Sequence, residues 1–176
     1  MKLRIDFDKG FSWFRARHVL PLLVAILLVL PSASIIAQDV NPFGVVEGFW
    51  QEDTVCNLGV GWERIIFDWS QHQPNGTDDW YTLNVDDRWI KAANDCGREV
   101  VAVFKNTPAW ATDGTPGPGV PRGLYLPVDD PNNLWASFVR RSAEYYASRG
   151  VWHFIVWNEP DISSDVYGFE FEGTLE

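Results

Sequence analysis

Segments with the pattern of buried strands alternate with helical segments from residue 41 onward, and this alternation constrains the fold more than any other feature. Four strands are predicted from runs rich in β-branched and aromatic residues, at residues 43–50 (with the strand exit), 62–69, 100–104 and 151–156. Helices are predicted between them, at residues 53–58, 84–96 and 130–150. Strict alternation of this kind predicts βαβ units and a parallel sheet, which could be a barrel or doubly wound.

The last predicted helix and the loop before it are marked by their turn residues. Asp130 and Pro131 are expected in the cap and first-turn positions of this helix, and Gly150 is expected to end it. Its inner stripe is expected to consist of Trp135, Phe138, Val139, Ser142, Ala143 and Tyr146. Residues 105–130 are rich in Pro and Gly and show no periodicity. A loop this long inside a compact domain is usually functional or disordered.

The glycines and the chain length bear on the choice between the two parallel folds. A doubly wound nucleotide-binding sheet should carry a Gly-rich loop after its first strand, and Gly44 and Gly48 do not form that pattern. A complete (β/α)8 barrel typically needs about 250 residues, whereas this chain has 176. A barrel of this type would therefore be only partly present.

The first 37 residues are interpreted as a targeting segment rather than as part of the fold. A basic region is followed by an apolar run at residues 19–30 and then by small residues that suit cleavage, which is typical of a secretory signal peptide. An uncleaved membrane anchor is the alternative, because residues 19–37 are almost long enough to span a bilayer at about 20 residues. In either case we expect export to a secreted or extracytoplasmic location, with the folded domain at residues 38–176.

The charge of the chain restricts its partners. The formal net charge is −10, and because residues 1–37 hold five Lys or Arg against two Asp, the remainder is more acidic still. A domain this acidic should repel nucleic acid and anionic membranes, so a neutral substrate is expected and a nucleic-acid partner is not. The ten Trp residues suit a core, but their flat faces also suit the apolar faces of sugar rings.

Two cysteines, Cys56 and Cys96, lie in the part expected to be exported, and each closes a predicted helix before a Gly-marked turn. They are either a disulfide, which would stabilise the fold by roughly 3–4 kcal/mol, or two buried free thiols. Together with the scattered His18, His72 and His153 they cannot supply a set of metal ligands. No metal or other cofactor is expected.

Residues 151–160 combine a buried strand with polar residues at its end. Pro160 ends the strand because it has no N–H to donate to the ladder. Ligands bind at the carboxyl ends of parallel strands, so Glu159 would direct a carboxylate into such a site. Trp157 could supply a flat apolar wall and Asn158 a hydrogen-bond donor. The alternative is that Asn-Glu-Pro forms only a strand-to-loop corner.

The run Trp157-Asn158-Glu159-Pro160 resembles the fourth-strand motif of the clan A glycoside hydrolases. These are retaining (β/α)8-barrel enzymes that include cellulases, β-xylosidases and family 39-like proteins. The resemblance covers roughly residues 41–161 and favours a TIM barrel, of which this chain would hold about the first four strand–helix units. It implies that Glu159 is the general acid/base and that Asn158 hydrogen-bonds the sugar 2-hydroxyl.

The same resemblance assigns three further residues to substrate binding. Arg64 lies in the second predicted strand, where family members often carry an Arg that hydrogen-bonds the nucleophile, although a surface or barrel-bottom ion pair is equally open. Trp69 begins a segment similar to the family's Trp-x-x-x-Glu-Pro, except that Gln73 replaces the Glu. Trp110 matches the Pro-x-Trp after the third strand and could stack on a sugar or pack in the core.

The nucleophile of the family is a Glu that ends the seventh strand, and the sequence stops at Glu176, shortly after the fourth. Glu170 and Glu172 lie in an acidic loop with no strand pattern behind them, and Glu47 does not match the nucleophile position. We therefore expect the amino-terminal part of a longer enzyme, inactive as this chain alone.

Two functions from different classes follow from the sequence. The first is an exported retaining glycoside hydrolase that acts on a neutral oligo- or polysaccharide through Glu159. The second is a non-catalytic exported carbohydrate-binding or scaffold protein that uses the same aromatic residues but lacks the second carboxylate. Neither function indicates an oligomeric state.

Overall fold

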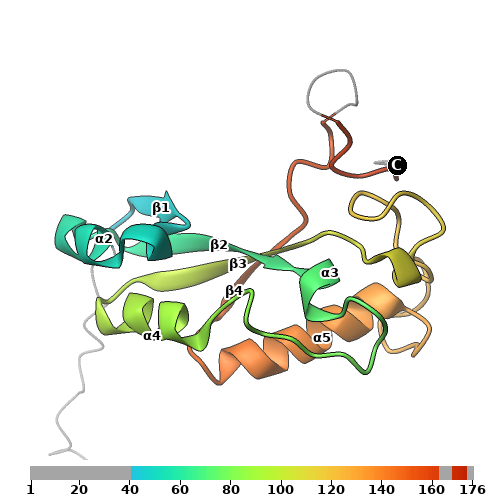
Figure 1. Ribbon diagram of the computed structural model, residues 1–176, viewed down its shortest axis with the longest axis horizontal. Coiled ribbons are helices and arrows are strands. Elements are labelled where there is room, and N and C mark those ends of the chain that lie inside the picture. The colour runs from blue at the N-terminus through green and yellow to red at the C-terminus, as the bar shows by residue number, and fades with distance from the viewer. Residues whose placement is uncertain (1–40, 163–167, 174–176) are drawn as a thin grey trace, which may run out of the picture. The chain divides into compact units, whose positions relative to one another are not determined.

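The computed structural model describes residues 41–162 and 168–173 (Figure 1). The chain divides into a unit of residues Met1–Asp39 and a unit of residues Val40–Glu176, and the described residues all belong to the second unit. The predicted targeting segment, including the possible anchor at residues 19–37, lies outside the described residues.

The described part of the chain contains one sheet of four parallel strands. The strands are β1 (Gly44–Val46), β2 (Trp62–Asp68), β3 (Glu99–Lys105) and β4 (His153–Val156). Their order in the sheet is the same as their order in the sequence. A doubly wound sheet reverses its strand order at a switch point, whereas a (β/α)8 barrel keeps sequential order. The fold is therefore a partial TIM-barrel-like α/β fold, as predicted.

Helical segments connect the strands. They are η1 (Gly48–Gln51), α2 (Glu52–Leu58), α3 (Trp69–His72), α4 (Asp87–Asp95), η2 (Ala109–Ala111) and α5 (Leu134–Ala147). The side chain of Asp86 accepts a hydrogen bond from the backbone N–H of Arg88, so Asp86 caps α4. Figure 1 shows α4 and α5 along the same side of the sheet, which is the arrangement that right-handed βαβ crossovers produce.

Several predicted boundaries are wrong, including the helix start at residue 84, which lies at Asp87, and two larger errors have a visible cause. The first strand ends at Val46 and not near residue 50, because the backbone N–H of Phe49 donates to the carboxylate of Glu63 (2.8 Å) and the chain leaves the sheet as η1. The helix predicted from Asp130 begins only at Leu134. Its cap is Asn133, whose side chain accepts from the N–H of Ala136 (3.0 Å), while Asp130 closes the preceding turn.

The core lies between the sheet and the helices. Ile65 and Phe67 on β2 are in register with Ala102 and Phe104 on β3, and all four side chains are buried. Phe138 on α5 packs against the ring of Phe104 with 5.4 Å between the centroids. The predicted stripe of α5 faces this core, with Trp135, Phe138, Ser142 and Tyr146 buried.

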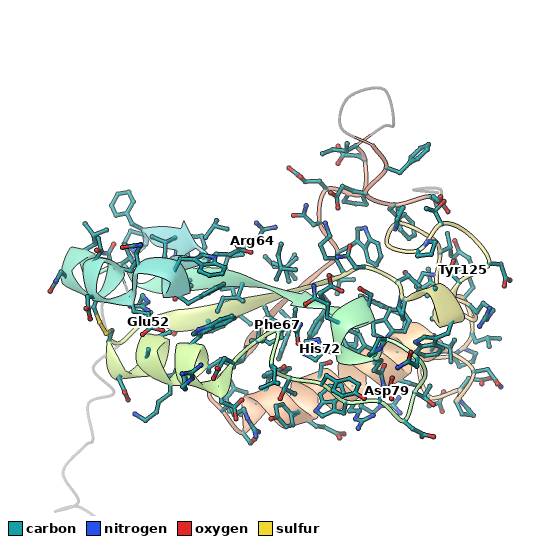
Figure 2. All side chains as sticks on the ribbon, in the orientation of Figure 1. Glu52, Arg64, Phe67, His72, Asp79 and Tyr125 are labelled. Atoms are coloured by element: carbon teal, nitrogen blue, oxygen red, sulfur yellow. A yellow bond between two sulfur atoms is a disulfide. The ribbon has the colours of Figure 1, made fainter. Side chains whose placement is uncertain are left out.

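The residues that alternate with these core positions point to the opposite face of the sheet. Val46 on β1 and Ile155 on β4 keep 60% and 42% of their surface exposed. Arg64 on β2 is in register with Val46, so it also belongs to this face. Figure 2 shows Arg64 on one side of the sheet and Phe67 and His72 on the other.

Two residue pairs join neighbouring elements near the start of the sheet. Cys56 on α2 and Cys96 at the end of α4 are joined as a disulfide, with Cα atoms 5.6 Å apart, which is an ordinary separation for such a bond. The guanidinium of Arg98, before β3, pairs with the carboxylate of Glu63 on β2 at 3.2 Å. Both side chains of this ion pair are almost fully buried, at 1% and 0% exposure.

The long loop between β3 and α5 has an internal structure of its own. Isolated antiparallel bridges pair Thr107 with Gly117 and Thr112 with Pro121. The hydroxyl of Thr112 also donates to the carbonyl of Val120 (2.8 Å). These contacts order the loop, so the expectation of a disordered segment is not supported.

Candidate active site

Backbone strain gathers where the strands end. Among residues 41–162 and 168–173, the non-glycine residues with positive φ are Glu47 (50°), Asn106 (67°), Trp157 (68°) and Glu159 (43°). Glu47, Asn106 and Trp157 directly follow β1, β3 and β4, and Glu159 lies two residues further on. A positive φ is unfavourable for residues with a side chain, and above all for bulky ones, and such residues cluster at functional sites.

The exit from β4 is held in place by the indole of Trp157. Its backbone N–H donates to the carbonyl of Phe104 (2.9 Å), and its ring N–H donates to the carbonyl of Glu170 (2.6 Å). The ring meets Trp135 and Phe171 edge to face, with centroids 5.5 and 5.3 Å away. Only 7% of Trp157 is exposed, so it acts chiefly as an anchor for the two residues that follow.

Asn158 and Glu159 extend from this anchor and form a chain of hydrogen bonds with Arg64. The guanidinium of Arg64 donates to the side-chain oxygen of Asn158. The amide nitrogen of Asn158 donates to the carboxylate of Glu159 (3.1 Å). Arg64 and Asn158 are half-buried and Glu159 is exposed. The structure thus brings together three predicted site residues and leaves a carboxyl group open to solvent, where it can exchange a proton with a bound molecule.

A second carboxylate is brought to the same end of the sheet by Gly168–Gly173. The amino group of Lys105, the last residue of β3, pairs with the carboxylate of Glu170 at 2.5 Å, with side chains 13% and 29% exposed. The N–H of Glu172 also donates to the carbonyl of Pro118 in the long loop (2.9 Å). The sequence offered no pattern that would reveal this contact, because residues 168–173 have neither strand nor helix periodicity.

Asp68, at the end of β2, organises the turn that follows it. Its carboxylate accepts hydrogen bonds from the hydroxyl of Ser70 (2.6 Å), the N–H of Gln71 (3.2 Å) and the amide of Asn106 (2.6 Å). This carboxylate is therefore engaged in capping α3 and in joining the ends of β2 and β3. Sequence reasoning missed both Asp68 and Asn106, although an Asp directly before a short helix is a recognisable N-cap signal.

A buried polar pair lies behind this turn. The ring of His72 contacts the hydroxyl of Tyr146 on α5 (2.6 Å) and the carbonyl of Asp68 (2.7 Å). Burial lowers the pKa of His72, and burial likewise raises the pKa of Tyr146. Both side chains are fully buried, so this pair supports the site without reaching it.

Two further tryptophans, Trp69 and Trp110, were predicted to bind sugar. The assignment of Trp69 to sugar binding is wrong in this structure, because the ring is 0% exposed and stacks on Phe138 in the core. Its N–H donates to the side-chain oxygen of Gln73 (2.8 Å), while the amide nitrogen of Gln73 donates to the carbonyl of Thr77 (2.8 Å), a contact that an ionised carboxylate could not make. Trp110 is half-buried, and its N–H donates to the carbonyl of Gln73 (2.6 Å), so part of its ring still reaches solvent.

A small apolar cavity of about 120 Å³ lies at the end of β4. It is lined by Pro121, Leu124, Trp135, Val156, Trp157, Pro160 and Phe171. Within residues 41–162 and 168–173, no group of three or more His, Cys, Asp or Glu side chains could hold a metal ion. In the same part of the chain no helix has the length and apolar character needed to cross a bilayer.

The fold and the strand-end site define a class, the TIM-barrel-like α/β proteins. No protein-family model and no curated protein sequence matches the chain. A family 39 glycoside hydrolase from the gut symbiont Bacteroides cellulosilyticus WH2 matches in structure with a TM-score of 0.53 and 15% identity, over 71% of this chain and 26% of that protein. At this identity the likeness shows a shared fold alone.

Two other solved structures match less well. A GH5_18 variant from Bifidobacterium longum subsp. longum in complex with Manβ1-4GlcNAc has a TM-score of 0.44 and 16% identity, covering 60% of this chain and 26% of that one. Fpglu1 from Fervidobacterium pennivoraus has a TM-score of 0.44 and 14% identity, covering 62% of this chain and 28% of that one. The chain thus spans about a quarter of the length of the solved structures it matches.

Proposed function

We propose that this chain is part of an exported retaining glycoside hydrolase in which Glu159 is the general acid/base. The observation that carries the proposal is the position of Glu159, an exposed carboxyl group just beyond the end of β4, hydrogen-bonded to Asn158, which is in turn held by Arg64. The carboxyl ends of the strands are where TIM-barrel enzymes carry their catalytic residues.

The proposed reaction has two steps. In the first, the carboxylic acid of Glu159 gives its proton to the glycosidic oxygen as a second carboxylate attacks the anomeric carbon, so that a glycosyl-enzyme forms and the alcohol leaves. In the second, the Glu159 carboxylate removes a proton from water, whose oxygen attacks the anomeric carbon and releases the sugar and the second carboxylate. Asn158 would hydrogen-bond the sugar 2-hydroxyl.

The second carboxylate is proposed to come from a strand outside the four described. Retention requires two carboxyl groups about 5–5.5 Å apart. Asp68 is engaged in capping α3, and Glu170 is paired with Lys105, so neither is free to attack a sugar in this structure. We therefore expect residues 1–176 alone to bind sugar without hydrolysing it.

Export is part of the proposal. The Cys56–Cys96 disulfide supports it, because disulfides persist mainly in oxidising compartments outside the cytosol. The basic and apolar residues 1–37 would serve as the signal peptide or anchor that leads the chain there.

The test replaces Glu159 in the natural exported protein that contains this chain. Aryl glycosides with a poor leaving group need a proton from the acid. The dinitrophenolate of dinitrophenyl glycosides leaves without being protonated. Glu159→Gln should therefore slow hydrolysis of the former by about 10²–10⁴-fold and spare the first step of the latter. Added azide should then restore turnover by attacking the glycosyl-enzyme without a general base.

The control is Glu144→Gln, which changes an exposed glutamate on α5 and should leave both rates unaltered. If Glu159→Gln hydrolyses poor and good leaving groups as fast as the native protein, the acid/base assignment is wrong. If the native protein binds oligosaccharides but hydrolyses no glycoside, the non-catalytic carbohydrate-binding function takes its place.

A further inference from the structure

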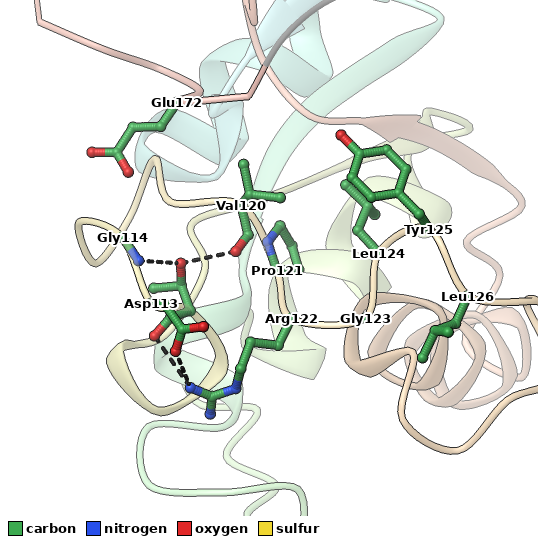
Figure 3. Close-up of a pocket in the computed structure, with 11 residues that line it drawn as sticks. Asp113, Gly114, Val120, Pro121, Arg122, Gly123, Leu124, Tyr125, Leu126 and Glu172 are labelled. Carbon is green, nitrogen blue, oxygen red and sulfur yellow. Dashed lines mark hydrogen bonds and ion pairs between the residues drawn. The ribbon is translucent and has the colours of Figure 1, made fainter.

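The long loop between β3 and α5 encloses a cavity of about 660 Å³ (Figure 3). Its volume falls in the range of small-ligand sites, roughly 300–1,000 Å³. Its lining includes Asp113, Val120, Pro121, Arg122, Tyr125 and Glu172. None of these residues was assigned to a site from the sequence.

One part of the lining is apolar and carries an aromatic ring. Tyr125 leaves 78% of its surface exposed, although a large aromatic side chain normally gains by being covered. Val120 and Pro121 form the wall beside it, and Figure 3 shows Tyr125 and Glu172 on either side of these two residues. A flat ring beside an apolar wall suits the C–H face of a pyranose.

The other part of the lining is polar and carries more negative than positive charge. The guanidinium of Arg122 pairs with Asp113 (2.9 Å) and also donates to the carbonyl of Trp110. The carboxylate of Glu172 accepts from the N–H of Thr115 (3.0 Å), and these hydrogen bonds lower the pKa of Glu172, so it is ionised at neutral pH. One cation against two carboxylates disfavours an anionic ligand, whereas all three groups can hydrogen-bond hydroxyl groups.

The loop cavity shares part of its lining with the small cavity at the end of β4. Pro121 and Leu124 line both this cavity and the smaller one formed by Trp157 and Pro160. Trp157 and Pro160 flank Asn158 and Glu159 in the chain, so the loop cavity shares two lining residues with a cavity at the end of β4.

We propose that the loop cavity is a distal subsite for a neutral sugar residue, so that the protein takes an oligo- or polysaccharide chain rather than a single glycoside. The proposal rests on the function proposed above. Tyr125 stacks on the sugar ring, and Asp113, Arg122 and Glu172 hydrogen-bond its hydroxyl groups. A substrate chain bound at Glu159 therefore extends over Pro121 into the loop.

Calorimetric titration of the full chain with β-1,4-linked disaccharides and hexasaccharides of glucose, xylose and mannose tests this subsite. We expect at least one hexasaccharide to bind more tightly than its disaccharide. Tyr125→Ala should weaken the binding of that hexasaccharide by about tenfold and leave the binding of the disaccharide unchanged. Tyr125→Phe should keep the gain, because the stacking face remains. Tyr81→Ala removes another exposed tyrosine (54%) that lines neither cavity and serves as the matched control.

The outcomes separate this proposal from the proposed function. The subsite is excluded if Tyr125→Ala retains the full gain from chain length, or if it weakens disaccharide and hexasaccharide equally. Neither result tests the assignment of Glu159 as the acid/base. Conversely, loss of the chain-length gain in Tyr125→Ala together with normal hydrolysis by Glu159→Gln would keep the subsite and refute the acid/base assignment.

Discussion

The guanidinium of Arg64, in the middle of β2, donates a hydrogen bond to the side chain of Asn158, a residue 94 positions further along the chain. The amide nitrogen of Asn158 in turn donates a hydrogen bond to the carboxylate of Glu159 (3.1 Å). The position of the candidate acid/base therefore depends on a strand two places away in the sheet. The family resemblance also assigned this arginine a hydrogen bond to the nucleophile, and that role stays a prediction.

The Arg64–Asn158 contact should appear as an energetic coupling. In a double-mutant cycle of Arg64→Met and Asn158→Ala, we expect a coupling of about 1 kcal/mol in the free energy of unfolding, since one partner is charged and both are half-buried. Urea denaturation of the four proteins measures it. The control is Lys91→Met, which removes a cation that pairs with Asp95 and not with Asn158. Its effect on the free energy of unfolding should add to that of Asn158→Ala. Additivity in the first cycle as well would mean that the contact contributes nothing.

The buried pair of Glu63 and Arg98 should be costly to break. Arg98→Met leaves the Glu63 carboxylate without its cation, and we expect a loss of about 3–5 kcal/mol in the free energy of unfolding. Adding Glu63→Gln should recover much of this loss, because the amide oxygen can still accept the Phe49 N–H while no buried charge remains. Chemical denaturation measures both variants. A double variant less stable than Arg98→Met would show that the charge itself is favourable.

The disulfide should contribute measurably to stability. It closes a loop with a sequence separation of 40 residues, for which loop entropy gives roughly 3–4 kcal/mol. Replacing Cys56 and Cys96 together by serine should lower the midpoint of thermal unfolding, and a reducing agent should lower it in the native protein alone. If the reducing agent destabilises the double-serine variant just as much, its effect does not act through this bond.

His72 should make stability depend on pH. Burial lowers its folded pKa below the ordinary value of 6.5, so the unfolded chain binds a proton in a pH range where the folded protein does not. The stabilisation is therefore complete above pH 6.5 and is lost as the pH falls from 6.5 through the folded pKa. Unfolding midpoints in urea between about pH 7.5 and pH 5 should fall in the native protein and less so in His72→Gln. Parallel curves for the two proteins would contradict this origin.

The sequence determined the parallel sheet and most of its elements, because hydrophobic periodicity and cap residues record local geometry and burial. Asp86 marks the start of α4, and the apolar runs of β2 and β3 agree with the structure within a residue or two. The start of α5 was misplaced locally, because Asn133 and not Asp130 is its cap, and two other errors come from contacts with residues outside the local segment. The Glu63 carboxylate binds the N–H of Phe49 where the first strand was predicted to continue. Side chains of α5 pack on Trp69, which is fully buried.

The tertiary structure alone decided which side chains meet at the strand ends. Glu170 comes to Lys105 across a sequence separation of 65 residues, and Glu172 closes a cavity formed by residues 112–126. Such contacts depend on the path of loops that have no periodicity, and neither hydropathy nor spacing carries that information. The candidate catalytic carboxylate and its partner Asn158 could be found from their motif, whereas the contacts of Glu170 and Glu172 could be found only after the chain was folded.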